Sequence, residues 1–438
     1  MTSSRPNVVL FISHDTGRFL SPYGVKTVRT PTFERFAAES VLFENAFATA
    51  PLCCPSRASC TTGRYPHQNG VNGLTSPLLG GWDFHPDERH AARLFADAGY
   101  ESVLCGFEHE SPLWQNLGFS RAISGSGGWY NGGGDLRNHA REIDSFLNER
   151  DGARPFFLQI GCHETHLEWT QFETPPDESL GVATLPWLHD LADVRREMAE
   201  FQGAVARMDQ CVGEMLRVLD GRGLADNTIV VLTTDHGIDF PRAKGTLLDA
   251  GIETFLLMRF PRDGWSAGRR VSEMVSNVDV LPTLLDAAGI AMPDNLAGRS
   301  FLPLLRGEPF TPRDRVFAEK TYHDTYDPSR AVRTATHKYI RHFEVNIFQD
   351  LRLATETRRH YLRDDWRRRH HEELYDLRSD PHERVNLATD PSRARLLKSL
   401  RSDLLQWMEQ TNDPLLRGPV PSPHYASLLR EFRDSASA

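Results

Sequence analysis

Unbroken runs of apolar residues recur along the first part of the chain, without the alternation of a half-exposed strand. Residues 7–13 read Asn-Val-Val-Leu-Phe-Ile-Ser, and residues 155–160 and 228–234 have the same texture. Such runs suit central parallel strands that are buried on both faces. Residues 193–219 have the length and patterning of a long amphipathic helix. The pattern therefore predicts an α/β fold.

The texture of the chain changes after about residue 312. Short apolar stretches at 316–318, 338–341 and 373–377 predict short strands, and residues 392–410 predict a helix near the end. A chain of 438 residues is long enough for one large domain and one smaller domain. We predict a catalytic domain over residues 1–311 and an α+β subdomain over residues 312–438.

Polar side chains follow two of the predicted central strands directly. His14 and Asp15 come after the first strand, and Asp235 and His236 come after the strand at 228–234. Ligands of α/β sheets usually bind at the carboxyl ends of such strands. Turn capping is the alternative explanation for either pair taken alone. Together, the pairs indicate a site at this edge of the sheet.

Residues 53–64 hold a thiol, a proline, an arginine and a Thr-Gly pair at fixed offsets. The stretch reads Cys-Cys-Pro-Ser-Arg-Ala-Ser-Cys-Thr-Thr-Gly-Arg. Arg57 lies four residues after Cys53, so a helix would place the two side chains one turn apart. The structural alternative is a cysteine-rich helix start, because free cysteine is among the most buried residue types.

Composition narrows the class of protein. The chain is 39% hydrophobic and 25% charged, as is typical of a soluble globular enzyme. No apolar run approaches the roughly 18 residues of a membrane helix. The formal net charge of −9 argues against nucleic acid as a partner. Six cysteines do not make a disulfide framework in so long a chain, and no hydrophobic signal segment precedes the first strand, so we expect a cytoplasmic protein. A signal segment trimmed from the chain is the alternative.

The stretch at 53–64 resembles the signature Cys-x-Pro-Ser-Arg-x-x-x-x-Thr-Gly of the type I, formylglycine-dependent sulfatase family. Pro55 and Arg57 set the register, so Cys53 is the residue that a separate maturing enzyme of such proteins oxidises to formylglycine. The resemblance covers essentially the whole chain and is closest to the heparan N-sulfatase (sulfamidase) branch. Other segments that carry it are 66–70 (Pro-His-Gln-Asn-Gly), 207–210 (Arg-Met-Asp-Gln), 373–376 (Glu-Leu-Tyr-Asp) and 380–388 (Asp-Pro-His-Glu-Arg-Val-Asn-Leu-Ala).

The resemblance implies an alkaline-phosphatase-like sandwich, with a large mixed, mostly parallel sheet between helices and a smaller C-terminal α+β domain. It also implies a sulfuric ester hydrolase that acts on a sulfate ester or N-sulfate of a saccharide. In this family one hydroxyl of the hydrated aldehyde attacks sulfur, which gives a covalent sulfo-enzyme hemiacetal, and the second hydroxyl later expels sulfate. Arg57 is then expected to steady the hydrate.

The resemblance also assigns roles outside the signature. His109 aligns with a histidine that acts as the base for the second hydroxyl. His166 aligns with a histidine that protonates or contacts the departing oxygen, and His163 is the reserve candidate, expected to bind substrate. Lys244 stands where the family places a cation that grips the sulfate. We expect His323 to reach into the substrate cleft from the smaller domain.

A divalent cation is implied as well. Its predicted ligands are Asp15, Asp235, His236 and the hydrate formed from Cys53, with His14 at a position where most sulfatases have aspartate. Calcium is the usual ion of the family and takes oxygen ligands, whereas imidazole suits manganese, zinc or iron better. Calcium and a transition metal such as manganese therefore both stay open.

Phe107 is a second departure from the family, because it stands where a lysine is usual. It removes a positive charge from the anion site, so we expect a compensating cation or a less negatively charged reacting group. Relatives of the fold use the same aldehyde on phosphorus. A phosphonate monoester hydrolase or phosphodiesterase is therefore the alternative enzyme, and His14 and Phe107 both favour it. An inactive binding protein is the non-enzyme alternative, and a homodimer is the oligomer that the family suggests.

Overall fold

The apolar runs form the centre of a large sheet. The computed structural model describes residues 5–125, 136–323, 325–344, 356–361 and 370–437. The strands of the large sheet are β1 (Asn7–Ser13), β2 (Val41–Phe47), β3 (Glu101–Gly106), β4 (Arg121–Ile123), β5 (Phe156–Gly161), β6 (Thr228–Thr234), β7 (Glu253–Thr254), β8 (Leu256–Arg259) and β9 (Arg269–Ser276).

The order of the strands puts β1 between β5 and β6. Over the described residues the order is β4-β3-β5-β1-β6-β8-β2-β7, and β9 pairs with β2. Neighbours from β4 to β6 are parallel, whereas β8 runs antiparallel to β6 and β2. The prediction of a large mixed, mostly parallel sheet is confirmed.

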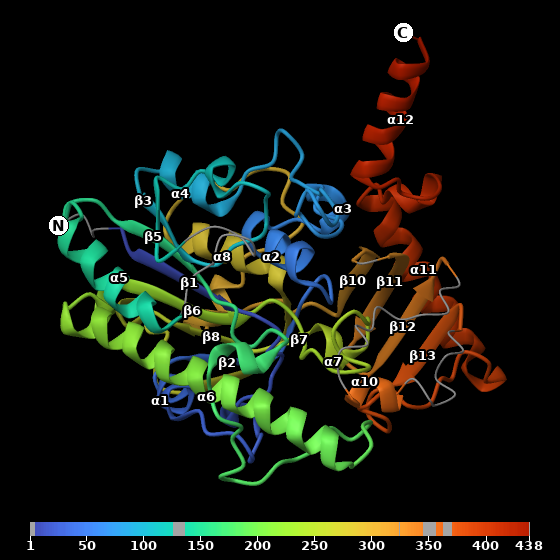
Figure 1. Ribbon diagram of the computed structural model, residues 1–438, viewed down its shortest axis with the longest axis horizontal. Helices are drawn as coiled ribbons and strands as arrows, with labels where there is room; N and C mark the ends of the chain where they lie inside the picture. The colour runs from blue at the N-terminus through green and yellow to red at the C-terminus, as the bar shows by residue number, and fades with distance from the viewer. Residues whose placement is uncertain (1–4, 126–135, 324, 345–355, 362–369, 438) are drawn as a thin grey trace.

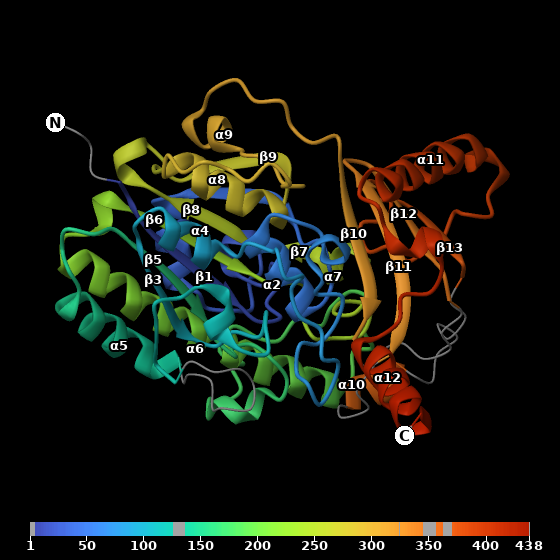
Figure 2. The ribbon, with the colours of Figure 1, turned by 90° about the horizontal axis from the view of Figure 1, so that it is seen from above.

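Helices cover both faces of this sheet (Figures 1 and 2). One face carries α1 (Pro31–Ala38), α5 (Leu136–Glu149) and α6 (Ala192–Gly221), and the other carries α2 (Cys53–Thr62), α4 (Ala91–Asp97) and α8 (Val280–Ala287). Shorter helices are α3 (Pro66–Asn69), α7 (Asp249–Ile252) and α9 (Leu302–Arg306). None of the helices in the described ranges is long and apolar enough to cross a bilayer.

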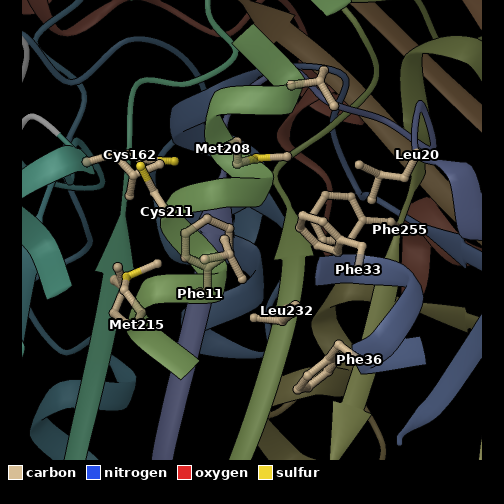
Figure 3. Packing of buried hydrophobic residues seen from close by; sticks show 14 of the residues in the cluster. Phe11, Leu20, Phe33, Phe36, Cys162, Met208, Cys211, Met215, Leu232 and Phe255 are labelled. Carbon is tan, nitrogen blue, oxygen red and sulfur yellow. The ribbon is translucent and has the colours of Figure 1, made fainter. Parts of the chain in front are cut away.

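The side chains of β1 alternate between two cores, which explains why the whole run is apolar. Val9 and Phe11 belong to the core under α6, whereas Val8, Leu10 and Ile12 belong to the core under α4 and α8. A strand that is buried on both faces needs apolar residues at every position. Figure 3 shows part of the first core, where β1, α1, α6 and β6 contribute Phe11, Phe33, Phe36, Met208, Cys211 and Leu232.

A second, antiparallel sheet stands beside the first (Figure 2). Its order is β10 (Arg315–Tyr322), β11 (Tyr326–Thr334), β12 (His337–His342) and β13 (Glu372–Asp376). The helix α11 (Ala394–Gln410) packs on it through Leu397, Leu400 and Leu404, and α12 (Pro423–Ser437) follows α11 along the chain. The short helix α10 (Glu356–Tyr361) instead contacts α6 of the large unit. A smaller α+β unit is confirmed, while the boundary between residues 311 and 312 stays a prediction.

The two sheets share a small core. Phe47 and Ile252 of the large unit pack with Val316, Ala331 and Ile340 of the small one. The small sheet is therefore fixed against the end of the large sheet rather than tethered by a linker. This placement brings the turn between β10 and β11 toward the loops that follow α2.

Candidate active site

The carboxyl ends of four neighbouring parallel strands meet at one edge of the large sheet. β1 leads into residues 14–15, β6 into residues 235–236, β3 into residues 107–110 and β5 into residues 162–166. These strands lie side by side in the order β3-β5-β1-β6. Segments that are far apart in the sequence are therefore brought together at the edge where α/β sheets bind ligands.

The helix α2 supplies the thiol. Cys53 is its first residue, all ten of its residues are buried, and Gly63 ends it with a φ of 67°, which is a left-handed conformation that favours glycine. The Ser56 hydroxyl donates a hydrogen bond to the carbonyl of Asp235. The helix is thereby fastened to the end of β6, and Cys53 Sγ lies 3.4 Å from His236 Nε2.

The Cys53 thiol is a weak nucleophile in this environment. The residue is 3% exposed, and burial raises the pKa of its thiol well above the ordinary value, although Lys244 opposes the shift. A reactive cysteine needs a lowered pKa, because the thiolate is the nucleophile. The position is prominent, but its unmodified side chain is poorly suited to attack.

Ligand-type atoms from His14, Asp15, Asp235, His236 and Cys53 crowd together. His236 Nε2 lies 3.2 Å from Asp15 Oδ1 and 3.7 Å from Asp235 Oδ1. His14 Nδ1 lies 3.4 Å from Asp15 Oδ1 and 3.1 Å from Asp235 Oδ2. Such separations match those between the ligands of one ion with metal–ligand bonds of about 2.0–2.5 Å.

The hydrogen bonds of His236 also suit a metal, and His14 contributes a second buried imidazole. His236 Nδ1 lies 2.9 Å from the carbonyl of Gly237, so Nδ1 donates this hydrogen bond and Nε2 faces the carboxylates. A ligating histidine usually donates its other ring N–H in this way. His14 is fully buried, and its Nε2 has no hydrogen-bond partner among the described residues. Burial lowers the pKa of His14 well below its ordinary value, which keeps the imidazole neutral.

Two buried cations balance the two carboxylates. Lys244 Nζ lies 2.7 Å from Asp15 Oδ2, and Arg57 Nε lies 3.1 Å from Asp235 Oδ2. Burial pushes the pKa of Asp15 upward, but Lys244 and two nearby histidines outweigh burial and hold the pKa well below its ordinary range. Burial pushes the pKa of Lys244 downward, and the carboxylates, Asp15 first, raise it instead. Both ion pairs therefore stay charged at neutral pH.

Arg57 leaves one nitrogen free. Its Nη2 donates to the carbonyls of Ile12 and Ser13, at 3.1 and 2.9 Å, and its Cζ lies 5.7 Å from the centroid of the Phe107 ring. Its Nη1 is buried and has no hydrogen-bond partner in the described part of the chain. A buried guanidinium N–H without an acceptor is a ready donor to an anionic oxygen.

Imidazoles form one wall beside His14. The ring centroids of His109, His166 and His163 lie 5.0, 5.1 and 6.1 Å from that of His14. Burial lowers the pKa of His166 to about 4 and that of His163 to about 3, and it lowers the pKa of His109 well below the ordinary value. The wall is therefore neutral at pH 7.

The proton of His166 has a defined place. Its Nδ1 donates to the carbonyl of Leu167, which leaves the lone pair on Nε2, 3.9 Å from Asp15 Oδ2. In this tautomer the ring accepts a proton before it can give one. His166 is thus a proton acceptor in the free protein.

Phe107 and Glu108 add no charge to the wall. The ring of Phe107 is fully buried and lies 4.0 Å, centroid to centroid, from that of His163. Burial and the neighbouring Glu110 raise the pKa of Glu108 to about 8. The pKa of Glu110 is lowered although burial opposes it, chiefly by hydrogen bonding to His90. Glu108 is therefore protonated at neutral pH, whereas Glu110 is charged.

His323 lies in the smaller unit, on the turn between β10 and β11. The adjacent Tyr322 donates its N–H to the carbonyl of Asn72, at 3.0 Å. In the same loop, the Thr75 hydroxyl donates to the carbonyl of His109, at 2.6 Å. The end of β10 is therefore hydrogen-bonded to the loop that carries Asn72 and Thr75, and this loop is hydrogen-bonded to the backbone of His109. The role of His323 in substrate binding stays a prediction.

Asp239 and Arg358 belong to the centre but were not predicted from the sequence. Asp239 Oδ2 lies 3.4 Å from Lys244 Nζ, and Arg358 donates to Asp239 Oδ1. Burial opposes ionisation, yet these two cations lower the pKa of Asp239 to about 2. Asp239 follows Asp235 by four residues, which is a weak signal, and nothing in the local sequence marks Arg358.

Family models cover most of the chain. The sulfatase model matches residues 6–290, and the model for the C-terminal part of N-sulphoglucosamine sulphohydrolase matches residues 242–410. The chain is 30% identical to human N-sulphoglucosamine sulphohydrolase, over 95% of this chain and 92% of the human protein. It is 25% identical to an N-acetylglucosamine-6-O-sulfatase of Bacteroides thetaiotaomicron, over 94% of this chain and 88% of that protein.

Solved structures share the fold at lower sequence identity. A protein solved with its substrate D-glucosamine-2-N,6-O-disulfate superposes with a TM-score of 0.73 at 20% identity, over 94% of this chain and 99% of the other. The phosphonate monoester hydrolase of Agrobacterium radiobacter superposes with a TM-score of 0.71 at 21% identity, over 93% and 96%. These structural likenesses show the fold alone. The sequence matches decide between a sulfatase and a phosphonate monoester hydrolase: the chain belongs to the sulfatase family of sulfuric ester hydrolases.

Proposed function

We propose that the protein is a formylglycine-dependent sulfatase that removes sulfate from a sulfated glucosamine, with the N-sulfate as the preferred group. The two relatives described above, each covering nearly the whole chain, are named for N-sulphoglucosamine and for N-acetylglucosamine 6-sulfate. The observation that carries the proposal is the place of Cys53. It heads a buried helix, 3.4 Å from His236, beside two carboxylates that are each paired with a cation.

Cys53 would carry the aldehyde after oxidation by a separate maturing enzyme. The raised pKa of its thiol supports this proposal, because an unmodified Cys53 is a weak nucleophile. The hydrated aldehyde would supply one hydroxyl for attack on sulfur and a second for release of sulfate. Asp15, Asp235, His236 and His14 would hold a divalent cation, which would polarise the reacting group and favour ionisation of a bound hydroxyl.

Arg57 and Lys244 would bind the sulfate group. Arg57 Nη1 is a buried donor without a partner in the described residues, and Lys244 is held beside Asp15 at 2.7 Å. Because both cations already neutralise a carboxylate, the centre offers directed N–H donors rather than a large net positive charge. Such a centre suits the single negative charge of a sulfate ester or sulfamate better than a dianion.

His109 and His166 would move protons. Both are neutral at pH 7, so each can accept a proton from a hydroxyl. His166 has its lone pair on Nε2, so it must take up a proton before it can protonate the departing atom. Release of an amine from an N-sulfate needs such a proton. We assign His109 to the hydroxyl that expels sulfate and His166 to the leaving group.

The test is a set of initial rates with matured protein whose aldehyde is confirmed by peptide mass. The substrates are N-sulfoglucosamine, glucosamine 6-sulfate, an aryl sulfate and an aryl phosphonate. We expect kcat/KM on the best sulfate to exceed that on the phosphonate by at least about 100-fold. Faster cleavage of the phosphonate would overturn the proposal. Faster cleavage of the 6-sulfate would keep the sulfatase and overturn the N-sulfate preference.

A further inference from the structure

The two aspartates of the centre are each neutralised by a cation, without any contribution from position 14. Asp15 pairs with Lys244 at 2.7 Å and Asp235 pairs with Arg57 at 3.1 Å. These four side chains are at most 8% exposed. In the metal-free protein, a third carboxylate at position 14 would face both aspartates from a distance of a few ångströms and would need a cation of its own.

His14 and Phe107 are in contact. Their ring centroids lie 5.0 Å apart at an interplanar angle of 56°, and both residues are fully buried. A cation for a carboxylate at position 14 could come from position 107, but the phenyl ring of Phe107 occupies that space. A neutral side chain at one position therefore requires a neutral side chain at the other, since burying an unpaired charge is costly.

The ligand atoms are rich in nitrogen. His14 Nδ1 and His236 Nε2 each lie within 3.1–3.7 Å of oxygens of both Asp15 and Asp235, and Lys244 engages the second oxygen of Asp15 at 2.7 Å. Calcium takes six to eight oxygen ligands, whereas zinc is satisfied by about four nitrogen, oxygen or sulfur ligands. Two imidazoles and two partly engaged carboxylates suit zinc and leave calcium short of oxygens.

We propose that His14 and Phe107 act as one coupled pair that makes the centre select a zinc-like transition metal over calcium. The inference rests on the proposed function only in placing the metal at the catalytic centre. His14 provides the nitrogen ligand, and Phe107 keeps the adjacent space free of a positive charge that would repel the ion. Changing either residue alone disturbs the charge balance, whereas changing both into an aspartate–lysine pair restores it.

The test measures metal affinity directly. Metal-free protein carrying Cys53→Ala, so that no thiol contributes at this position, is titrated with Zn²⁺ or Ca²⁺ by calorimetry, and matured protein is checked for metal content by mass spectrometry. We expect Zn²⁺ to bind at least about 100-fold more tightly than Ca²⁺. His14→Asn, which keeps the charge and removes the imidazole, should lower the Zn²⁺ affinity at least about 10-fold.

A double-mutant cycle tests the coupling. Phe107→Lys alone should weaken the binding of both Zn²⁺ and Ca²⁺, because it adds an unpaired cation. The His14→Asp variant should have a lower melting temperature than the parent protein. The double variant His14→Asp/Phe107→Lys should recover the melting temperature and bind Ca²⁺ more tightly than Zn²⁺. His342→Asn changes another buried histidine, in the second sheet, and it should leave both affinities unchanged.

Two results would overturn the inference. One is tighter binding of Ca²⁺ than of Zn²⁺ by the parent protein, and the other is additive effects of the two substitutions on affinity and melting temperature. Sulfate hydrolysis is measured separately, so the proposals can fail independently. A calcium-selective enzyme that cleaves the sulfate removes this inference alone, and a zinc-selective protein that cleaves only the phosphonate removes the proposed function alone.

Discussion

Two fully buried arginines, Arg57 and Arg330, differ in how completely they are hydrogen-bonded. Arg330 donates from Nε and Nη2 to the two oxygens of Asp413, at 2.6 and 3.1 Å, and from Nη1 to the carbonyls of Lys320 and Ser329, at 2.8 and 3.0 Å. Arg57 has partners for Nε and Nη2, but its Nη1 has none among the described residues. One guanidinium closes a network, and the other leaves a donor for a ligand.

The comparison shows why close ligand-type atoms alone do not identify a metal centre. His67, Glu319 and Asp413 also place such atoms within 4.8 Å of one another. Arg330 lies among them, however, 3.3 Å from Glu319 and 2.6 Å from Asp413. Arg330 contacts both carboxylates of that cluster, whereas at the sheet edge each carboxylate has its own cation and His236 Nε2 faces both of them. We therefore assign a structural role to the cluster of His67, Glu319 and Asp413, and a catalytic role to the group at the sheet edge.

The largest expected effect separates two adjacent cysteines. Cys53→Ala should lower kcat on the preferred sulfate by at least about 10⁴-fold, because it removes the nucleophile. Cys54→Ala is the control, since Cys54 is also buried and its Sγ contacts Thr75 Oγ1 at 3.8 Å. Initial rates and thermal unfolding of both variants check this. Comparable rates for Cys53→Ala and the parent protein would refute the role of Cys53.

Arg57→Lys tests the free donor. Lysine keeps the charge beside Asp235 but loses the planar fork that reaches the ligand and the backbone carbonyls. We expect kcat/KM to fall about 10²–10³-fold, the usual effect of losing one donor to a developing charge. Steady-state kinetics measure the effect, and an unchanged kcat/KM would mean that Nη1 does not reach the substrate.

Arg330→Lys is the matched change in the closed network. It should lower the free energy of unfolding by about 2–4 kcal/mol, because several buried acceptors lose their partner, and it should leave kcat/KM of the folded protein nearly unchanged. Urea unfolding followed by circular dichroism measures the loss. Equal effects of the two substitutions on rate and stability would erase the distinction between the two arginines.

The sequence predicted the main strands because their physical cause is local. A strand with helices on both faces is apolar at every position, as β1 and β6 are, and such a run stands out. The candidate site followed from two further local signals, namely polar residues at strand ends and the stretch that begins at Cys53. The comparisons confirm the fold and the enzyme class, whereas the individual roles stay predictions.

Other features of the centre could not be predicted because they depend on partners that are distant in the sequence. Arg358 contacts Asp239 across 119 positions, and no residue near either one signals the pair. The contact of Phe107 with His14 likewise joins the ends of β3 and β1. The sequence placed His14 and Phe107 in the site, but it could not show that the two side chains are in contact, so that the charge at one position affects the other.

The raised pKa of Glu108 predicts how the free energy of unfolding depends on pH. The pKa of Glu108 in the folded protein is about 8, above its ordinary 4.5, so the folded state binds a proton that the unfolded state has released. The resulting stability is complete below about pH 4.5 and is lost as the pH rises to 8, at about 1.4 kcal/mol per unit. Glu108→Gln should remove this loss, so its unfolding free energy should exceed that of the parent increasingly from pH 5 to 8.

Glu110→Gln is the opposite control. The pKa of Glu110 is lowered, so its charge stabilises the fold above its ordinary pKa, and the substitution should destabilise the protein throughout pH 5–8. Urea unfolding at intervals of one pH unit measures both variants. Parallel curves for Glu108→Gln and the parent would show that Glu108 is ionised in the folded protein and that the wall carries a negative charge.

The smallest expected effect concerns the turn of the second sheet. If His323 contacts the sugar rather than the sulfate, its loss removes binding that is equal in the ground and transition states, so KM rises while kcat stays constant. We expect His323→Ala to raise KM about 3–10-fold, the cost of one polar contact. A tenfold lower kcat with unchanged KM would instead place His323 at the reacting group. Because the loop that carries Asn72 and Thr75 connects the end of β10 to the backbone of His109, His109→Gln serves as the reference for that second outcome.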